Sequence, residues 1–257
     1  MALKITFLGT GTSQGVPLIG CHCAVCNSSD PRNKRLRSSA LIEVNGRKIL
    51  IDAGPDFRYQ MLRSCTDHLD AILLTHNHKD HTGGLDDVRA FNFMENRDFP
   101  IYCEEYVFNS LKMEYAYAFD PAKIYPGSPR FTIHTIDSKK PFFIEEVGVI
   151  PIRVIHGKLP ILGYRIGSIA YITDANHIPE EEFEKLKHLD VFVINCVKYN
   201  PHPSHFGLEA ALAVIKRVGA KKSFITHISH YLPEYKKFAE ILPKDVFSAY
   251  DMLTIEV

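Results

Sequence analysis

Four side chains that can bind a metal ion fall within six consecutive positions of this sequence: His76, His78, Asp80 and His81. Imidazole nitrogens and carboxylate oxygens together suit zinc, manganese or iron. The apolar run 71–74 directly before them predicts a short buried strand. A loop at the end of a rigid strand can hold several ligands around one point. This stretch therefore predicts a metal centre that other parts of the chain must complete.

Further residues of ligand type end strand-like runs later in the chain. His156, Asp174 and His227 follow apolar stretches in the same way as His76. We expect these strand ends to meet at one edge of a layered sheet fold. Two divalent ions would then share seven ligands: His76, His78 and His156 on one ion, Asp80, His81 and His227 on the other, and Asp174 as a bridge.

Three cysteines form a second candidate site within residues 20–27. Cys21, Cys23 and Cys26 have the spacing C-x-C-x2-C, which can wrap a single zinc ion, whose structural sites are tetrahedral and rich in sulfur. This spacing leaves the fourth ligand open, and His22, between the thiols, is a poor candidate for it. The alternative is a set of buried or redox-active thiols.

The bulk composition excludes some partners. Lys+Arg and Asp+Glu balance at 30 each, so no net positive charge attracts a membrane or a long nucleic acid. No apolar run approaches the roughly 20 residues of a membrane span, and the first residues resemble a strand and no signal peptide. The six cysteines then favour free thiols or metal ligands over disulfides. These features predict a cytoplasmic protein.

The elements that position these residues show no linker or repeat, so we expect one domain over 1–257. Asn45-Gly46 signals a hairpin turn between two strands. Asp52 either orients metal ligands from behind or caps a helix. An aromatic-rich excursion at 91–128 is expected to pack on the core, or to line the substrate pocket. Strands are expected at 4–8, 39–44, 47–51, 70–74, 149–155, 161–166, 169–173, 191–195 and 223–226. Helices are expected at 57–64, 85–93, 104–118, 179–187 and 206–218, the last with Ser204 as its cap.

The run from Thr75 to His81 resembles the HxHxDH signature of the metallo-β-lactamase superfamily. His156, Asp174 and His227 follow in the order of the remaining ligands of that superfamily. The resemblance covers essentially the whole chain. It implies an α+β fold, a four-layer αββα sandwich of two mixed sheets flanked by helices, with a dinuclear site at one edge.

Within this superfamily the chain is similar to the phosphodiesterases of the carbon–phosphorus lyase (phosphonate) pathway, which share the Gly-Thr-Gly start and the CxCxxC zinc site. The resemblance implies His230, three positions after His227, as the fourth ligand of a structural zinc. It also implies that His205 contacts the phosphate or the leaving group. His202 is the rival for this role, and Glu209, one helical turn after His205, could orient it.

The expected function is that of a metal-dependent phosphodiesterase. A hydroxide bridging two divalent ions (manganese or zinc, with iron as a third option) would cleave a small phosphodiester, cyclic ones included, to a phosphomonoester, with Asp80 and His205 as catalytic residues. The alternatives are a hydrolase of a thioester, lactone or RNA with the same fold, and a non-hydrolytic protein resembling that of pyrroloquinoline quinone biosynthesis. The full set of seven ligands favours hydrolysis. A homodimer is one option for the assembly.

Overall fold

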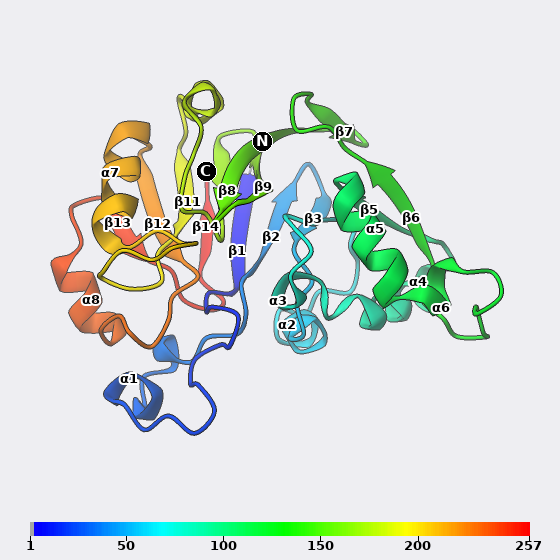
Figure 1. Ribbon diagram of the computed structural model, residues 1–257, viewed down its shortest axis with the longest axis horizontal. Coiled ribbons are helices and arrows are strands. Elements are labelled where there is room, and N and C mark those ends of the chain that lie inside the picture. The colour runs from blue at the N-terminus through cyan, green and yellow to red at the C-terminus, as the bar shows by residue number, and fades with distance from the viewer. Residues whose placement is uncertain (1–2) are drawn as a thin grey trace.

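Two seven-stranded β-sheets form the frame of the computed structural model, which describes residues 3–257 (Figure 1). The first sheet has the spatial order β14 (Thr254–Glu256), β1 (Leu3–Gly9), β2 (Ser39–Val44), β3 (Arg47–Ile51), β4 (Ala71–Leu73), β5 (Phe99–Cys103) and β6 (Phe131–Thr135). The second has the order β13 (Val246–Ser248), β12 (Lys222–Thr226), β11 (Val191–Asn195), β10 (Ile169–Tyr171), β9 (Leu159–Ile166), β8 (Val147–His156) and β7 (Phe142–Ile144).

Each sheet joins an antiparallel half to a parallel half. In the first sheet the pairings from β14 to β3 are antiparallel and those from β3 to β6 are parallel. In the second sheet the pairings from β13 to β10 are parallel and those from β10 to β7 are antiparallel. Antiparallel neighbours can be joined by tight turns, whereas parallel neighbours need longer crossovers. The two mixed sheets predicted from the sequence are confirmed.

The helices occupy the crossovers and the long connections. The α-helices are α1 (Ala24–Asn27), α2 (Phe57–Arg63), α3 (Lys79–Thr82), α4 (Arg89–Glu95), α5 (Glu105–Glu114), α6 (Ala116–Phe119), α7 (Leu208–Val218) and α8 (Tyr235–Ile241). Short 3-10 helices are η1 (Pro31–Asn33), η2 (Leu85–Val88) and η3 (Glu180–Leu186). No helix within residues 3–257 has both the length and the apolar character that crossing a membrane requires.

Side-chain alternation along the strands divides the core into three layers. In β3, Ile49 and Ile51 pack between the sheets, while Leu50 packs under the helices of the first sheet. In β11, Val193 packs between the sheets and Phe192 packs under α7 and α8. Successive strand residues point to opposite faces, so each sheet needs a cover on both sides. Figure 1 shows α7 and α8 on one side of the strands and α2, α4 and α5 on the other, which confirms the αββα sandwich.

Most predicted strands are present, and the hairpin at Asn45-Gly46 is confirmed, with positive φ at both residues (53° and 80°). Five strands were not predicted from the sequence: β5, β6, β7, β13 and β14. Strand β5 lies inside the aromatic-rich stretch 91–128. Side chains of this stretch, such as Phe91, Val107 and Tyr115, pack in the outer core of the first sheet.

Three helix predictions were wrong in detail. The segment 179–187 forms the 3-10 helix η3, in which residues three apart share a face, and the apolar pair Phe183 and Leu186 has this spacing. Helix 104–118 is interrupted at Tyr115, which leaves helical geometry and donates a hydrogen bond to the Thr82 carbonyl (2.8 Å). Segment 85–93 is also divided, into η2 and α4.

Helix α7 begins after Gly207, so the prediction that Ser204 caps it was wrong. A Cβ at Gly207 would lie 2.6 Å from the carbonyl oxygen of Asn200, so no larger residue fits at this position. The hydroxyl of Ser204 instead lies 3.0 Å from Nδ1 of His205.

A buried tyrosine joins the two sheets beside the predicted metal loop. Tyr164 in β9 is 1% exposed, and its hydroxyl donates a hydrogen bond of 2.6 Å to the carbonyl of Leu74, two residues before His76. We expect Tyr164→Phe to lower the free energy of unfolding by about 1–3 kcal/mol, because the Leu74 carbonyl would stay buried without this donor. Denaturant titration measures this change.

Tyr171→Phe is the matched control for Tyr164→Phe. Tyr171 is equally buried at 1%, but its hydroxyl has no hydrogen-bond partner among residues 3–257. Its removal should leave stability unchanged or raise it slightly. Equal losses in the two variants would contradict the role given to the Tyr164 hydroxyl.

Candidate metal centre

The predicted ligands come from the ends of strands in both sheets. Strand β4 leads to His76, β8 ends at His156, β10 leads to Asp174, and β12 leads to His227. The three remaining predicted ligands belong to the short helix α3, which follows β4. Asp80 and His81 lie in this helix, and His78 is at its N-cap position.

The structure brings all seven of these side chains together. Within four sets, the ligand atoms lie within 4.8 Å of one another: His76, His78 and His156; His76, His81 and Asp174; Asp80, Asp174 and His227; and His156, Asp174 and His205. Asp174 belongs to three of the four sets, as a residue shared by two ions would. The first set has the members expected on one ion, and Asp80 and His227 share a set as expected for the other, but His81 is grouped with His76 and Asp174. The division of the ligands between two ions stays a prediction.

Asp174 is the most contacted of these residues. Its Oδ2 lies 2.7 Å from Nε2 of His81, and its Oδ1 lies 2.8 Å from Nε2 of both His205 and His227. Asp174 is 2% exposed. Burial favours the neutral acid, but the charges of His227 and His81 outweigh it and hold the pKa of Asp174 well below its ordinary value.

Four of the predicted ligand histidines use Nδ1 for a hydrogen bond. His76 Nδ1 lies 2.9 Å from the Thr75 hydroxyl, and His81 Nδ1 lies 2.6 Å from Oδ2 of Asp52. His156 Nδ1 lies 2.7 Å from the Ser204 carbonyl, and His227 Nδ1 lies 3.0 Å from the Ser38 hydroxyl. A partner on one ring nitrogen fixes the tautomer and leaves the other nitrogen free to bind a metal.

Asp52 lies behind the site and does not cap a helix. Its carboxylate accepts hydrogen bonds from the backbone N–H of Thr75 (2.8 Å), from the Thr75 hydroxyl (2.9 Å) and from His81. The first turn of α2 follows Asp56 instead. The structure thus decides between the two alternatives that the sequence left open, because Asp52 orients His81.

The backbone at this edge is unusual. Asp52, Asp174 and His227 have positive φ values of 62°, 57° and 54°, in the left-handed region that side chains other than glycine rarely adopt. Such residues cluster at functional sites, where the surrounding structure imposes them. Each one follows a strand, where the chain turns to place its side chain at or directly behind the site.

The donor set fits a cation. The Nε2 atoms of His76 and His81 are buried and make no hydrogen bond within residues 3–257. Nδ1 of His81 donates to Asp52, and its Nε2 faces the oxygens of Asp80 (3.1 Å) and Asp174 (2.7 Å). A metal ion among these atoms would bind the Nε2 lone pair and both carboxylates.

The electrostatics of the histidines reflect the same arrangement. Burial lowers the pKa of His81, but the carboxylates of Asp174, Asp52 and Asp80 outweigh it and raise the pKa well above the ordinary value. Burial holds the pKa of His76 well below its ordinary value. A neutral His76 is the form that binds metals.

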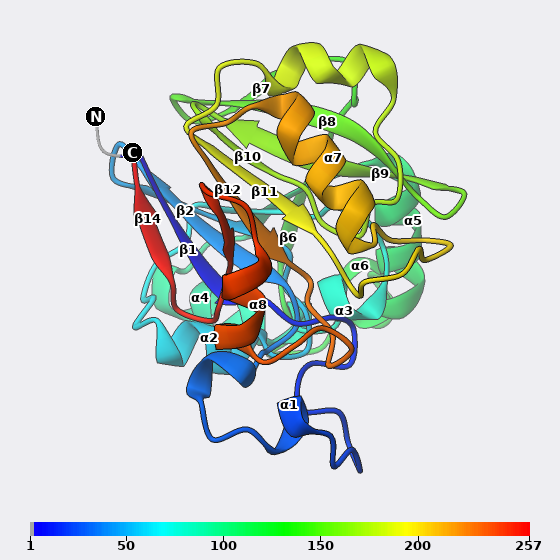
Figure 2. The ribbon, with the colours of Figure 1, turned by 90° about the vertical axis from the view of Figure 1, so that its left-hand side faces the viewer.

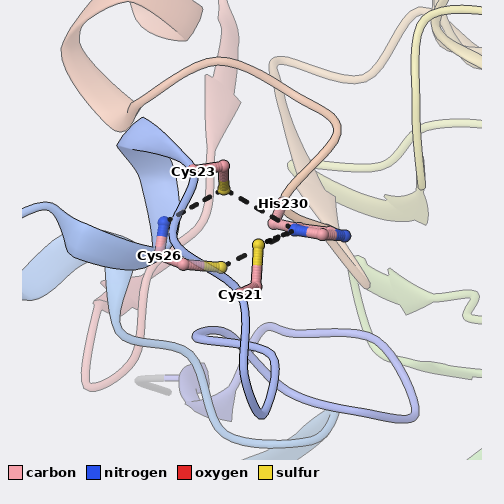
Figure 3. Close-up of side chains that lie close together, drawn as sticks. All are labelled: Cys21, Cys23, Cys26 and His230. Carbon is pink, nitrogen blue, oxygen red and sulfur yellow. Dashed lines mark hydrogen bonds between the residues drawn. The ribbon is translucent and has the colours of Figure 1, made fainter.

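The cysteines form a separate cluster with His230 (Figure 3). Nδ1 of His230 lies 3.2 Å from the sulfur of Cys21 and 3.6 Å from those of Cys23 and Cys26. The three sulfurs and this nitrogen point toward one another from the N-terminal segment and from the loop after β12. Such a set matches a structural zinc site, whereas His22 is not part of it.

The thiolate form that zinc requires is favoured at one of these cysteines. The backbone N–H of Cys26, above all, lowers the pKa of Cys23 to about 6, and His230 contributes in the same direction. Figures 1 and 2 show the segment carrying α1 projecting from one end of the molecule, so these side chains attach it to the second sheet.

The sequence left open whether His205 or His202 contacts the substrate. His205 contacts Asp174, while His202 contacts His205 through their Nδ1 atoms (3.1 Å), which favours His205 for the inner position. Glu209 makes no hydrogen bond to His205 among the described residues.

Two residues that contact predicted ligands, Ser38 and Thr75, were not predicted from the sequence. Thr75 is adjacent to His76, but no local pattern indicates Ser38, which lies 189 positions from His227.

A family model described as a beta-lactamase superfamily domain matches residues 47–228. The chain belongs to the beta-lactamase superfamily. The chain is also 43% identical over 253 residues to an octanoyltransferase of Porphyromonas gingivalis. The match covers 98% of this chain and 51% of that protein. The chain thus spans about half the length of that relative.

Solved structures agree with the superfamily assignment. The crystal structure of a diphosphatase from the PhnP family matches with a TM-score of 0.93 at 39% identity, covering 100% of this chain and 98% of the other. Zinc-bound PqqB from Methylobacterium extorquens matches with a TM-score of 0.80 at 18% identity, covering 99% and 100%, and shows the shared fold alone. The predicted superfamily is confirmed, and within it the chain is similar to the PhnP family.

We expect Asp174→Ala to lose metal from the active centre, because both predicted ions would lose the carboxylate that they share. Metal content per chain after dialysis measures this loss. Asp190→Ala, which removes a carboxylate paired with Lys221 near the surface, is the control and should keep the wild-type content. Retention of both active-centre ions in Asp174→Ala would contradict the bridging assignment.

Cys23→Ser should lose the zinc of the sulfur cluster and lower the free energy of unfolding by about 3–4 kcal/mol, the linkage expected for an ion at 100–1,000 times its Kd. Thermal unfolding with and without a chelator measures the effect. Cys65→Ser, at an exposed thiol outside the cluster, is the control. A Cys23→Ser variant that keeps its zinc would show that the cluster binds metal differently.

Proposed function

We propose that this chain is a phosphoric diester hydrolase that cleaves a small phosphodiester at a dinuclear metal centre. The observation that carries the proposal is the buried carboxylate of Asp174, shared between sets of ligand atoms and contacted by His205. When bound, two divalent ions activate water and stabilise the charge that develops on a phosphoryl oxygen. The proposal includes two ions of manganese, zinc or iron at the active centre and one structural zinc ion in the sulfur cluster.

The protein's own residues position the reactants. In this proposal His76, His78 and His156 would hold one ion, and Asp80 and His227 the other, with Asp174 between them. His81, whose Nε2 lies 3.1 Å from Asp80, would join the second ion. Because Asp80 lies beside His81 and is less deeply buried than Asp174, its carboxylate is placed to orient the attacking water as well. Water adds to phosphorus, and the bond to the leaving oxygen breaks.

His205 is proposed as the proton donor to the leaving oxygen. Its Nε2 contacts Asp174 (2.8 Å), and its Nδ1 lies 3.0 Å from the Ser204 hydroxyl and 3.1 Å from Nδ1 of His202. These contacts fix the ring on both sides. Histidine is the side chain most often used for such proton transfers near neutral pH.

The space beside His205 suits a small leaving group. A cavity of about 440 Å³ is lined by His205, His202, Tyr199, Phe206 and Glu209, among others. Ligand pockets of roughly 300–1,000 Å³ hold small molecules. Together with the balanced charge of the chain, this favours a small phosphodiester over a long nucleic acid.

A second candidate is hydrolysis of an acyl thioester. It is favoured by the 43% identity to an octanoyltransferase, a name that describes the transfer of an acyl group. A panel of bis(p-nitrophenyl) phosphate, 2′,3′-cyclic nucleotides, an octanoyl thioester and a lactone separates the candidates. Turnover of the thioester alone would reject the phosphodiesterase proposal.

His205→Ala should leave the metal content intact and lower kcat/KM for alkyl phosphodiesters by about 10²–10⁴-fold, the usual contribution of a general acid. For bis(p-nitrophenyl) phosphate the loss should stay below about tenfold, since this leaving group departs without a proton. Parallel kinetics on the two substrate classes measure the difference.

His202→Ala is the matched control, because His202 touches His205 but not Asp174. Its losses should be small on both substrate classes. Equal losses on both classes in His205→Ala would contradict a proton-donor role. Loss of metal from that variant would instead make His205 a ligand.

A further inference from the structure

Ser38 makes a buried contact with a predicted metal ligand from the other sheet. It lies directly before β2 of the first sheet, whereas His227 follows β12 of the second. Both residues are 1% exposed. The Ser38 hydroxyl lies 3.0 Å from Nδ1 of His227 and also donates a hydrogen bond of 2.9 Å to the carbonyl of Gly11.

The Gly11 carbonyl determines the direction of the other bond. A hydroxyl has one proton, and a carbonyl oxygen can only accept. Since the Ser38 proton goes to Gly11, its oxygen must accept from His227, so the His227 proton lies on Nδ1. The Nε2 lone pair then points toward Asp174 Oδ1, 2.8 Å away.

The same arrangement occurs once more in the site, which supports this assignment. The Thr75 hydroxyl donates to Oδ2 of Asp52 (2.9 Å) and lies 2.9 Å from Nδ1 of His76. A carboxylate also only accepts when ionised, so Thr75 accepts from His76. Two hydroxyls from different segments thus direct two ligand histidines to the same tautomer.

The two peptides on either side of Gly11 are held by loops next to both sheets. After the Gly11 carbonyl, the N–H of Thr12 donates to the Ile228 carbonyl (3.3 Å). The N–H of Gly11 donates to the Leu36 carbonyl (2.8 Å), and the N–H of Ile228 donates to the Thr10 carbonyl (2.8 Å). A Cβ at Gly11 would lie 3.0 Å from the Leu36 carbonyl oxygen, so the close approach of these segments favours glycine. The acceptor that orients the Ser38 hydroxyl is therefore fixed in place.

We propose that Ser38 is a positioning residue that fixes the Nδ1-protonated tautomer and the ring orientation of His227. This role rests on the proposed metal-dependent function. Ser38 touches neither the substrate nor a metal ion; it keeps Nε2 of His227 available to the ion held with Asp80 and Asp174. The role is therefore specific to one of the two ions.

A weaker partner limits the effect of removing Ser38. The Thr173 hydroxyl donates to Oδ2 of Asp174 (3.2 Å), so its oxygen can accept from Nδ1 of His227, 3.4 Å away. Both distances are long for hydrogen bonds to a hydroxyl. Thr173 therefore replaces Ser38 only in part.

The test compares metal affinities of Ser38→Ala and of a control. Ser38→Ala should weaken one active-centre ion by about 10–100-fold, the usual cost of losing a residue that orients a ligand. Zinc titration against a competing chelator measures each affinity. The other active-centre ion and the sulfur-cluster zinc should bind as in the wild type. Ser223→Ala, at a buried serine of β12 whose hydroxyl bonds no predicted ligand among residues 3–257, should leave all affinities unchanged.

Two outcomes of this titration would overturn the proposal. Wild-type affinities in Ser38→Ala would show that the hydroxyl does not matter to His227. Equal weakening of all three ions would show a general loss of structure. Neither result depends on which substrate is cleaved, so failure of the phosphodiesterase proposal is detected separately, by the substrate panel.

A measurement on the wild type covers the case in which Ser38→Ala does not fold. In the zinc-loaded protein, the Nδ1 proton of His227 should give a slowly exchanging NMR signal, with a nuclear Overhauser contact to the β-protons of Ser38. Absence of that contact would mean that the hydrogen bond does not form, and the proposal would fail. In a folded Ser38→Ala variant, this signal alone should exchange faster.

Discussion

The buried carboxylate of Asp174 lies within 2.8 Å of Nε2 atoms of His205 and His227, and still closer to His81. A charge can be buried only when opposite charges or hydrogen bonds surround it. These partners come from both sheets and from the loops between them. The convergence of the strand ends on one edge is therefore an electrostatic requirement as well as a result of packing. A cation at this point would also satisfy the buried Nε2 atoms that have no hydrogen-bond partner in the described chain.

The sandwich can meet this requirement because both of its sheets are packed on both faces. The core between them is apolar, and the parallel strands are buried on both faces. Their ends can then carry conformations that would destabilise a less supported segment. The positive φ of Asp52, Asp174 and His227 is one case, and the close approach of the Gly11 backbone to Leu36 is another. The strained positions lie where the fold is best able to hold them.

Local signals explain what the sequence could and could not predict. Patterns that lie within a few residues could be recognised in the sequence. They are the Asn45-Gly46 turn, the apolar runs before the ligands and the cysteine spacing. The short strand β7 and the late strands β13 and β14 carry too little pattern of their own, because their neighbours in the sheets define them. The hydrogen bond between Ser38 and His227 joins residues from different sheets. Only the folded structure can bring such partners together.

The N-terminal segment 10–38 links the two metal sites. In its middle the three cysteines meet His230, and at its end Ser38 contacts His227, three positions earlier in the same loop. The loop is fastened between them, since the N–H of Ile228 donates to Thr10 (2.8 Å). A zinc ion in the sulfur cluster would restrict this segment and the loop at once. A zinc-loaded cluster would therefore stabilise the position of a predicted metal ligand through the backbone, although it would contribute no atom to the reaction.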